Sequence, residues 1–192
     1  YLEPKDARRL PAFIKFALAS ALMALEDAEL NLGEVDLSRA GAIVGSGIGG
    51  IEVIEEQYRV MLEKGPRRVS PFFVPFEIIN MAAGQIAIAL RLRGPNFGVV
   101  TACATGNHAI GEACRIIQRG DADVILAGGT EAAITPLSFA GFCSMRAIST
   151  RNDDPKHASR PFDRERDGFV MAEGAGVVVL ESLSHALRRN AK

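Results

Sequence analysis

The stretch from residue 97 to residue 117, FGVVTACATGNHAIGEACRII, decides the fold because it joins a predicted strand to a predicted helix. An apolar run that ends in Val99 and Val100 is typical of a buried strand. From Asn107 onward, apolar residues recur at helical spacing. Cys103 lies between these two patterns, with only small residues beside it. The sequence therefore predicts a thiol at the corner where a strand turns into a helix.

Two interpretations of Cys103 follow from its surroundings. Most free cysteines behave as small buried hydrophobes, and Cys103 fits that description. The positive end of a helix, however, favours a thiolate, and small neighbours leave room for a substrate carbonyl beside backbone N–H groups. The pattern resembles the nucleophile elbow of hydrolases, with sulfur in place of oxygen. From the residues alone, packing and nucleophilic catalysis both stay open.

Composition excludes several classes of protein. The chain has 192 residues, 48% of them hydrophobic, and a net charge of −1, so we expect no bulk attraction to nucleic acid or to membranes. The most apolar segment, 13–25, is too short to span a bilayer and contains Lys15, and no signal peptide is recognisable. Three cysteines without zinc or disulfide spacing predict reduced thiols, no metal site and a cytoplasmic location.

Hydrophobic patterns predict an α/β fold with layers of helices on a sheet. Apolar residues at helical spacing alternate with β-branched runs, which suits parallel strands covered on both faces. We expect helices over 7–29, 51–64, 79–90 and 107–119, and strands over 41–44, near 99, over 122–129 and over 175–181. A polar, irregular segment at 149–169 predicts a long surface loop.

The glycine turn GSGIGG, residues 45–50, satisfies the pattern of a dinucleotide-binding turn between a strand and a helix. That fingerprint also requires an acidic residue about 20 positions further on, where this chain carries Arg67, Arg68 and Ser70. The hypothesis that the chain is an NAD-binding oxidoreductase therefore rests on this turn alone. The three histidines offer no convincing base for Cys103, and the better expectation for His108 is a packed or interface residue.

Longer motifs resemble those of the β-ketoacyl-acyl carrier protein synthases. The matching stretches are TACATGNHAIG (101–111), GDADVILAGGTEAAITPL (120–137), GFCSMRAIST (141–150) and RPFDRERDGFVMAEGAGVVVLE (160–181). GSGIGG and SPFFVP (70–75) point to the elongating type II branch. The resemblance implies a thiolase-like fold, layered α-β-α-β-α. It also implies that residues 1–192 form the N-terminal half only, with the first strand and the C-terminal half absent.

The resemblance implies an acyltransferase of fatty acid synthesis, a β-ketoacyl-acyl carrier protein synthase II. Cys103 would be the nucleophile that takes an acyl chain as a thioester, and decarboxylation of malonyl-carrier protein would then extend it by two carbons. No cofactor and no metal are needed. The two histidines and the lysine that assist in the family lie in its second half, and none of the histidines here matches them, so we expect the isolated chain to be inactive.

Further roles are implied for residues that line the substrate pocket or bind the partner. Ile48 would lie at the bottom of the acyl pocket, Phe73 would reach into the pocket of the partner subunit of a homodimer, and Phe142 would belong to a mobile loop beside the nucleophile. The basic residues implied for docking the acidic acyl carrier protein are Lys5, Arg8, Arg9, Arg67, Arg68 and Arg146. Neither nucleic acid nor membrane is expected as a partner.

Three alternatives stay open beside this interpretation. The ketosynthase of a polyketide system shares the same signatures. A non-catalytic, chain-length-determining subunit also shares the fold, but such proteins commonly replace the nucleophile with Gln, so Cys103 argues against it. A fragment that serves only folding or dimerisation would be compatible with every motif.

Overall fold

A four-stranded sheet forms the centre of the computed structural model, which describes residues 1–2 and 4–191 and leaves the side chains of Lys5 and Asp6 undescribed. Its strands are β1 (Ala40–Gly45), β2 (Asn96–Phe97), β3 (Val124–Glu131) and β4 (Gly174–Glu181), in the order β2-β1-β3-β4. β1 pairs in parallel with β2 and β3, whereas β4 runs antiparallel to β3. The sheet is therefore mixed.

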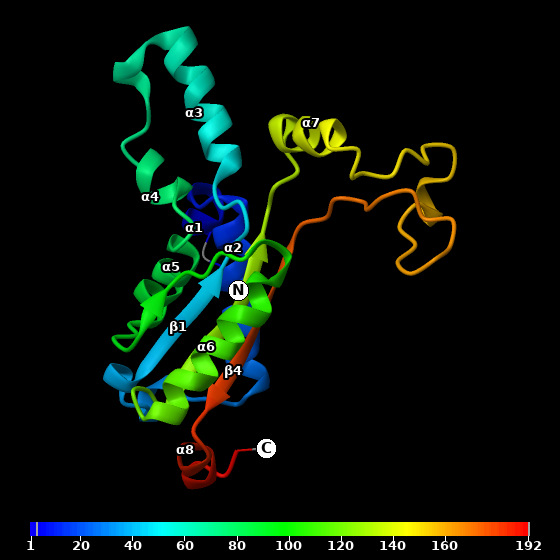
Figure 1. The fold of residues 1–192 in the computed structure, drawn as a ribbon. Helices are drawn as coiled ribbons and strands as arrows, with labels where there is room; N and C mark the ends of the chain where they lie inside the picture. The colour runs from blue at the N-terminus through cyan, green and yellow to red at the C-terminus, as the bar shows by residue number, and fades with distance from the viewer. Residues whose placement is uncertain (3, 192) are drawn as a thin grey trace.

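The orientation of β4 corrects the expectation of an all-parallel sheet. The chain leaves β3 at Glu131, crosses the segment 132–173 and enters β4 at Gly174, which is paired with Glu131. Because the connection returns at the same end of the sheet, no crossover is made and the two strands must run in opposite directions. This connection carries the helix α7 (Pro136–Ser144), and it projects beyond the sheet in Figure 1.

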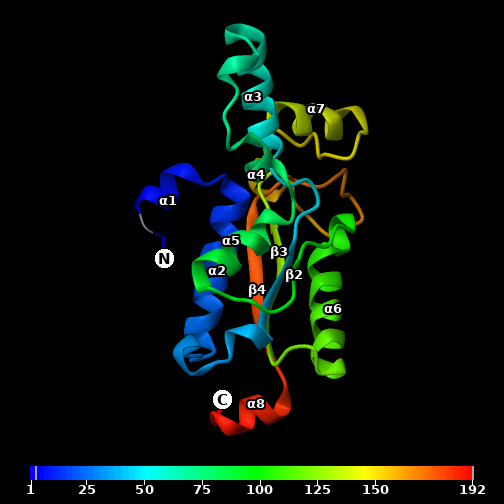
Figure 2. The same cartoon turned by 90° about the vertical axis from the view of Figure 1, so that its left-hand side faces the viewer.

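Helices cover both faces of the sheet, as Figure 2 shows. α2 (Ala12–Asp27) and α5 (Met81–Leu90) pack on one face, and α6 (Thr105–Arg119) packs on the other. The remaining helices are α1 (Pro4–Arg9), α3 (Ile51–Lys64), α4 (Phe73–Glu77) and α8 (Leu183–Arg188), and short 3₁₀ turns lie at 32–34, 37–39, 66–68, 102–104 and 155–157. The layered α/β prediction is confirmed.

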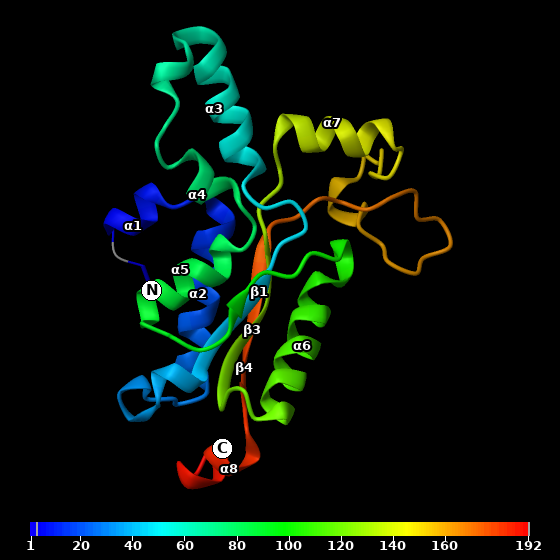
Figure 3. The same cartoon turned by 60° about the vertical axis from the view of Figure 1, so that its left-hand side comes forward.

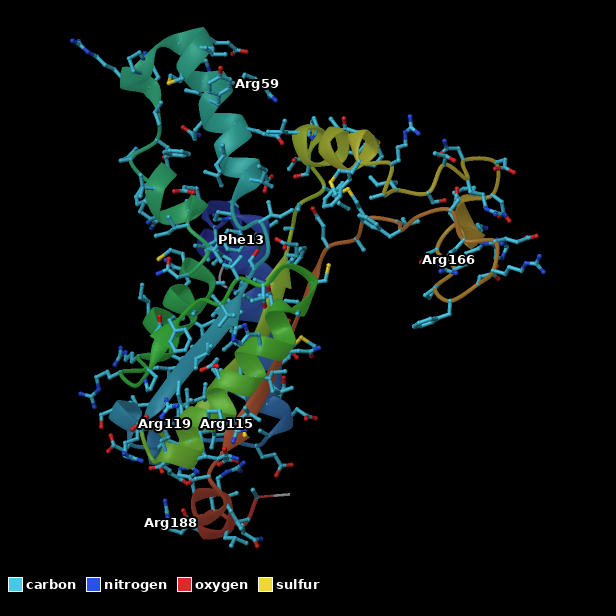
Figure 4. The ribbon with its side chains drawn as sticks, in the orientation of Figure 1. Phe13, Arg59, Arg115, Arg119, Arg166 and Arg188 are labelled. Atoms are coloured by element: carbon cyan, nitrogen blue, oxygen red, sulfur yellow. The ribbon has the colours of Figure 1, made fainter. Side chains whose placement is uncertain are left out.

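Successive side chains of the central strands point to opposite faces of the sheet, and this divides the core into two parts. Val44 and Leu126 point toward α2 and α5, whereas Ile43 and Ile125 point toward α6. All four side chains are almost fully buried, as expected for strands with helices on both faces. Phe13 of α2, which is 1% exposed, lies inside the molecule in Figure 4, whereas the labelled arginines lie at its periphery.

The helix predicted over 7–29 is two helices. α1 ends at Arg9, and α2 begins at Ala12 after Pro11. Proline lacks an N–H for the preceding turn and restricts the residue before it, so the helix breaks at Leu10 instead of continuing through it.

Other differences fall beside the cysteines. The strand expected near Val99 ends at Phe97; Val99 is buried and Val100 is 51% exposed. The loop expected around Phe142 is the helix α7, and α6 begins at Thr105, two residues earlier than predicted. The three cysteines are unpaired, as their spacing predicts, and all three are exposed. No described helix is long and apolar enough to cross a bilayer.

An ion pair between Arg39 and Asp123 joins the residues that immediately precede β1 and β3. Arg39 Nε donates to Asp123 Oδ2 at 2.6 Å, and a second guanidinium nitrogen donates to Oδ1 at 3.2 Å. The hydrogen bond from Arg39 lowers the pKa of the Asp123 carboxyl below its usual value. A bidentate arginine–carboxylate pair of this kind is stronger than a neutral hydrogen bond and fixes the relative orientation of the two side chains.

Acid should weaken this ion pair. Because the folded-state pKa of Asp123 is lowered, its stabilising effect is present above the unfolded-state pKa, near 3.9, and is lost as the pH falls through the folded-state value. We expect Asp123→Asn to lower the melting temperature by a few degrees at neutral pH and to match the original chain in strong acid. Thermal unfolding at a series of pH values measures this. Equal melting temperatures at neutral pH would contradict it.

Candidate active site

Cys103 lies at the tip of a tight turn that leads into α6. The 3₁₀ turn Ala102–Ala104 is closed by the Ala104 N–H, which donates to the Thr101 carbonyl at 3.1 Å. The Thr101 N–H donates to Thr105 Oγ1 at 2.9 Å, so the two ends of the turn are tied across Cys103. Cys103 is therefore exposed and held just ahead of the first turn of α6, where the helix dipole favours negative charge.

The residue before the thiol has an unusual backbone conformation. Ala102 has φ 49°, in the left-handed region that residues with a Cβ rarely adopt. Strain of this kind persists where the surrounding structure enforces it, and it collects at functional sites. The turn thus has the sharpness expected of a nucleophile elbow, with the strained position at Ala102.

Close backbone contact brings this turn to the ends of β1 and β3. A Cβ on Gly45 would lie 2.1 Å from the Val99 carbonyl oxygen and 2.4 Å from Thr105 Cγ2. A Cβ on Gly129 would lie 3.2 Å from Gly106 Cα. Only residues without side chains let the segment 98–106 approach the sheet this closely. The position of Cys103 is therefore set by glycines in two strands.

A cavity of about 680 Å³ opens beside the thiol. Cys103, Ile48 and Phe142 all line it, together with residues from the ends of β1, β3 and β4. Phe142 of α7 meets Phe169 edge to face, with ring centroids 5.2 Å apart. Most of the remaining lining residues are glycine, alanine or apolar side chains. The arrangement places a thiol in the wall of a largely apolar hollow, which can hold an acyl chain.

Phe73 does not reach this cavity within the chain. It belongs to α4, is half-buried, and borders a separate hollow of about 420 Å³ that Arg8 and Arg9 also line. The Arg9 guanidinium lies 4.2 Å from the centre of the Phe72 ring, a cation–π contact. Three of the four residues predicted for the reaction and the pocket therefore gather around one cavity, and Phe73 lies apart.

All the arginines predicted for docking are exposed. Lys5, the sixth residue predicted for docking, has a side chain that lies outside the described part of the structure. Arg8 and Arg9 end α1, and Arg67 and Arg68 form the 3₁₀ turn after α3. Arg146 follows α7, with φ 56°. In Figure 1 α1, the turn beyond the far end of α3 and the end of α7 lie apart from one another, so these residues form separate groups.

The three histidines pair with carboxylates away from the cavity. His185 Nδ1 lies 2.6 Å from a Glu181 carboxylate oxygen, and His157 Nδ1 lies 2.9 Å from one of Asp154. His108 is 46% exposed on α6, 3.6 Å from a Glu112 oxygen, so it is not packed within the chain. None of the three lines the cavity, so this chain brings no histidine to Cys103.

The glycine turn at 45–50 binds a carboxylate of the chain itself. Glu131, the last residue of β3, accepts hydrogen bonds from Ser46, Gly47 and Ile48. A phosphate would have to displace this carboxylate, so the geometry does not favour the dinucleotide interpretation. Glu131 was not singled out in the sequence. The register that pairs Gly45 with Gly129 brings it to the turn, and no spacing in the sequence reveals that register.

Comparison with known proteins places these motifs in one family. Residues 1–186 match the family described as "Beta-ketoacyl synthase, N-terminal domain". Two curated relatives named 3-oxoacyl-(acyl-carrier-protein) synthase 2, from Vibrio cholerae and Rhizobium meliloti, are 53% and 55% identical over the whole of this chain, which covers 46% of each. A type II polyketide ketosynthase in complex with its acyl carrier protein is 34% identical, with a TM-score of 0.88 over 94% of this chain and 46% of that one. The chain thus spans about half the length of these relatives.

The close approach at Gly45 generates a testable expectation. Gly45→Ala would put a methyl group inside the van der Waals radii of Val99 and Thr105. We expect it to reduce the free energy of unfolding by about 3 kcal/mol, the upper end of the usual range, and to change the rate at which iodoacetamide alkylates Cys103. Denaturant unfolding and peptide mass spectrometry measure the two effects.

Gly111→Ala is the matched control on α6. A Cβ there meets nothing within 4 Å, so the substitution should stabilise the helix by about 0.5–1 kcal/mol and leave the alkylation rate unchanged. If Gly45→Ala were as harmless as Gly111→Ala, the close packing would not position the thiol.

Proposed function

This chain belongs to the β-ketoacyl synthase family, and we propose that it supplies the N-terminal half of a 3-oxoacyl-acyl carrier protein synthase that elongates fatty acids. The observation that carries the proposal is Cys103, exposed ahead of α6 in the wall of an apolar cavity. The shares of identity favour fatty acid elongation over a polyketide system, since the relatives named synthase 2 are 53–55% identical and the polyketide ketosynthase 34%.

Acyl transfer to Cys103 is the first step of the proposed reaction. The sulfur, as thiolate, attacks the thioester carbonyl of an acyl group carried by acyl carrier protein. The bond from that carbonyl to the carrier's sulfur breaks, and the carrier leaves as a thiolate, which takes up from the solvent the equivalent of the proton that Cys103 gave up. Cys103 lies at the positive end of α6, and the small residues around it leave space for the carbonyl.

Condensation is the second step. A malonyl group on another carrier loses carbon dioxide, and the resulting carbanion attacks the carbonyl bound to Cys103. The bond from that carbonyl to Cys103 breaks, so the thiolate is restored and the chain is two carbons longer. This step needs groups that assist decarboxylation, and none of the histidines of this chain lines the cavity. We assign those groups to the second half of the enzyme, as the family resemblance implies.

The second half also has an apolar surface to cover. Val178 on the edge strand β4 is 43% exposed on the face of the sheet that α6 covers only in part. Val170, which lines the cavity, is 47% exposed, and Val100, three residues before Cys103, is 51% exposed. Exposed apolar groups around a cavity suit a contact with further protein, which supports a half enzyme over a self-sufficient one.

Acyl carrier protein and a second subunit complete the proposal. One solved relative is described as a ketosynthase in complex with its acyl carrier protein. The exposed arginines of α1, of the turn after α3 and after α7 suit electrostatic steering of an acidic carrier. Phe73, which does not reach the cavity of its own chain, suits the predicted role across a homodimer interface.

Acyl transfer can be tested on the complete enzyme of which we propose this chain to be half. Incubation with an acyl-carrier thioester should add one acyl mass, and peptide mapping should place it on Cys103. Cys103→Ala should abolish the adduct and lower turnover by at least about a thousandfold, since the nucleophile itself is removed.

Cys114 and Cys143 are internal controls because both are also exposed. Their alanine variants should acylate and turn over like the original enzyme. An adduct on either of them, with Cys103 unmodified, would refute the assignment of the nucleophile.

Carrier docking can be tested by charge reversal. We expect Arg67→Glu with Arg68→Glu to raise KM for the acyl carrier about tenfold, less at high salt, with little effect on kcat. The matched control reverses Arg115 and Arg188, two exposed arginines that lie far from α3 in Figure 4. Equal effects of the two double variants would mean that only net charge matters.

A further inference from the structure

We propose that Glu131 is a positioning residue that fixes Ile48 in the wall of the Cys103 cavity and thereby decides how well long acyl chains are accepted. The inference rests on the proposed function, because it concerns the substrate of the same cavity. Glu131 touches no reacting atom in this proposal; it acts through the backbone of the glycine turn.

The carboxylate of Glu131 is the acceptor around which the turn folds. Ser46 Oγ–H donates to Oε1 at 2.7 Å, and the Gly47 N–H donates to Oε2 at 2.8 Å. The Ile48 N–H points between the two oxygens, at 3.2 and 3.3 Å. The Gly49 N–H in turn donates to Ser46 Oγ at 2.8 Å. Three donors therefore meet one charged acceptor, which makes these bonds stronger than neutral ones.

The fit between the turn and the carboxylate is close. A Cβ on Gly47 would lie 2.7 Å from Glu131 Oε2, so glycine is needed for the carboxylate to approach. At its far end the turn is held by the Gly50 N–H, which donates to the Glu77 carbonyl at 3.1 Å. Ile48 lies between these two anchors. The backbone of Ile48 is thus fixed by Glu131 on one side and by α4 on the other.

The same two residues border the cavity. Glu131 and Ile48 both line the hollow that contains Cys103. A glutamine at position 131 removes the negative charge and replaces one acceptor oxygen with an NH₂ group, so the hydrogen bonds that hold the turn become weaker and the turn can shift. Any shift of the turn moves Ile48 and changes the shape of the wall. Only an acyl chain long enough to reach that wall senses the change.

The test compares a butyryl and a tetradecanoyl group on acyl carrier protein as substrates of the complete enzyme. For Glu131→Gln we expect kcat/KM with the tetradecanoyl substrate to fall about tenfold, while the value with the butyryl substrate stays within about twofold. The rate of Cys103 alkylation by iodoacetamide should not change. A fall shared equally by both substrates, or no fall, would overturn the proposal, since a purely structural role gives no dependence on chain length.

Asp123→Asn is the matched control, because it makes the same carboxylate-to-amide change at the opposite end of β3 and does not border the cavity. It should leave the ratio of the two substrates unchanged. If Glu131→Gln does not fold, Glu131→Asp keeps the charge but withdraws it by one methylene, and the ratio should move in the same direction. An unchanged ratio in that variant would overturn the proposal. Failure of the proposed function itself would look different, because the original enzyme would then acylate Cys103 with neither substrate.

Discussion

Contact between backbones at the ends of two parallel strands is the constraint on which the rest of this structure depends. At Gly45 the segment before Cys103 comes so close that even a methyl group would collide with the Val99 carbonyl oxygen. At Gly129 the start of α6 lies against the neighbouring strand. The apolar face of α6 can then pack on the sheet through Ala109 and Ala113, and its first turn points at the cavity. The small residues between α6 and the sheet thus determine where the Cys103 thiol lies.

The charged carboxylate of Glu131 at this end of the sheet is bound by groups of the chain itself. The turn that resembles a phosphate-binding loop is already satisfied by Glu131, so its backbone donors stabilise a wall of the cavity instead of holding a ligand. α3 and α7 extend beyond the sheet, as Figure 3 shows, and exposed arginines follow each of them: Arg67 and Arg68 after α3, and Arg146 after α7. The interior at this end is therefore apolar with one compensated carboxylate, and the positive charge stays outside.

Local patterns in the sequence were sufficient for much of the fold, and non-local pairing was not. The helix over 51–64 was predicted to the residue because its apolar spacing and the Gly65-Pro66 stop are both local. The direction of β4 was missed because it depends on where a segment of about forty residues returns to the sheet. Cys103 could be identified as a candidate from its position between a predicted strand and a predicted helix. Ile48 and Phe142 could be identified only through the family resemblance. Glu131 was missed because its partners come from the register between two strands.

The central claim is that Cys103 carries an acyl chain that extends into the cavity toward Ile48. The most direct measurement is a crystal structure of the complete enzyme after incubation with a tetradecanoyl-carrier thioester. The proposal predicts continuous density from Cys103 Sγ along the cavity to the glycine turn, with the Glu131 carboxylate still bound to that turn. Acyl density on Cys114 or Cys143, or a chain on Cys103 that leaves the cavity for solvent, would contradict it.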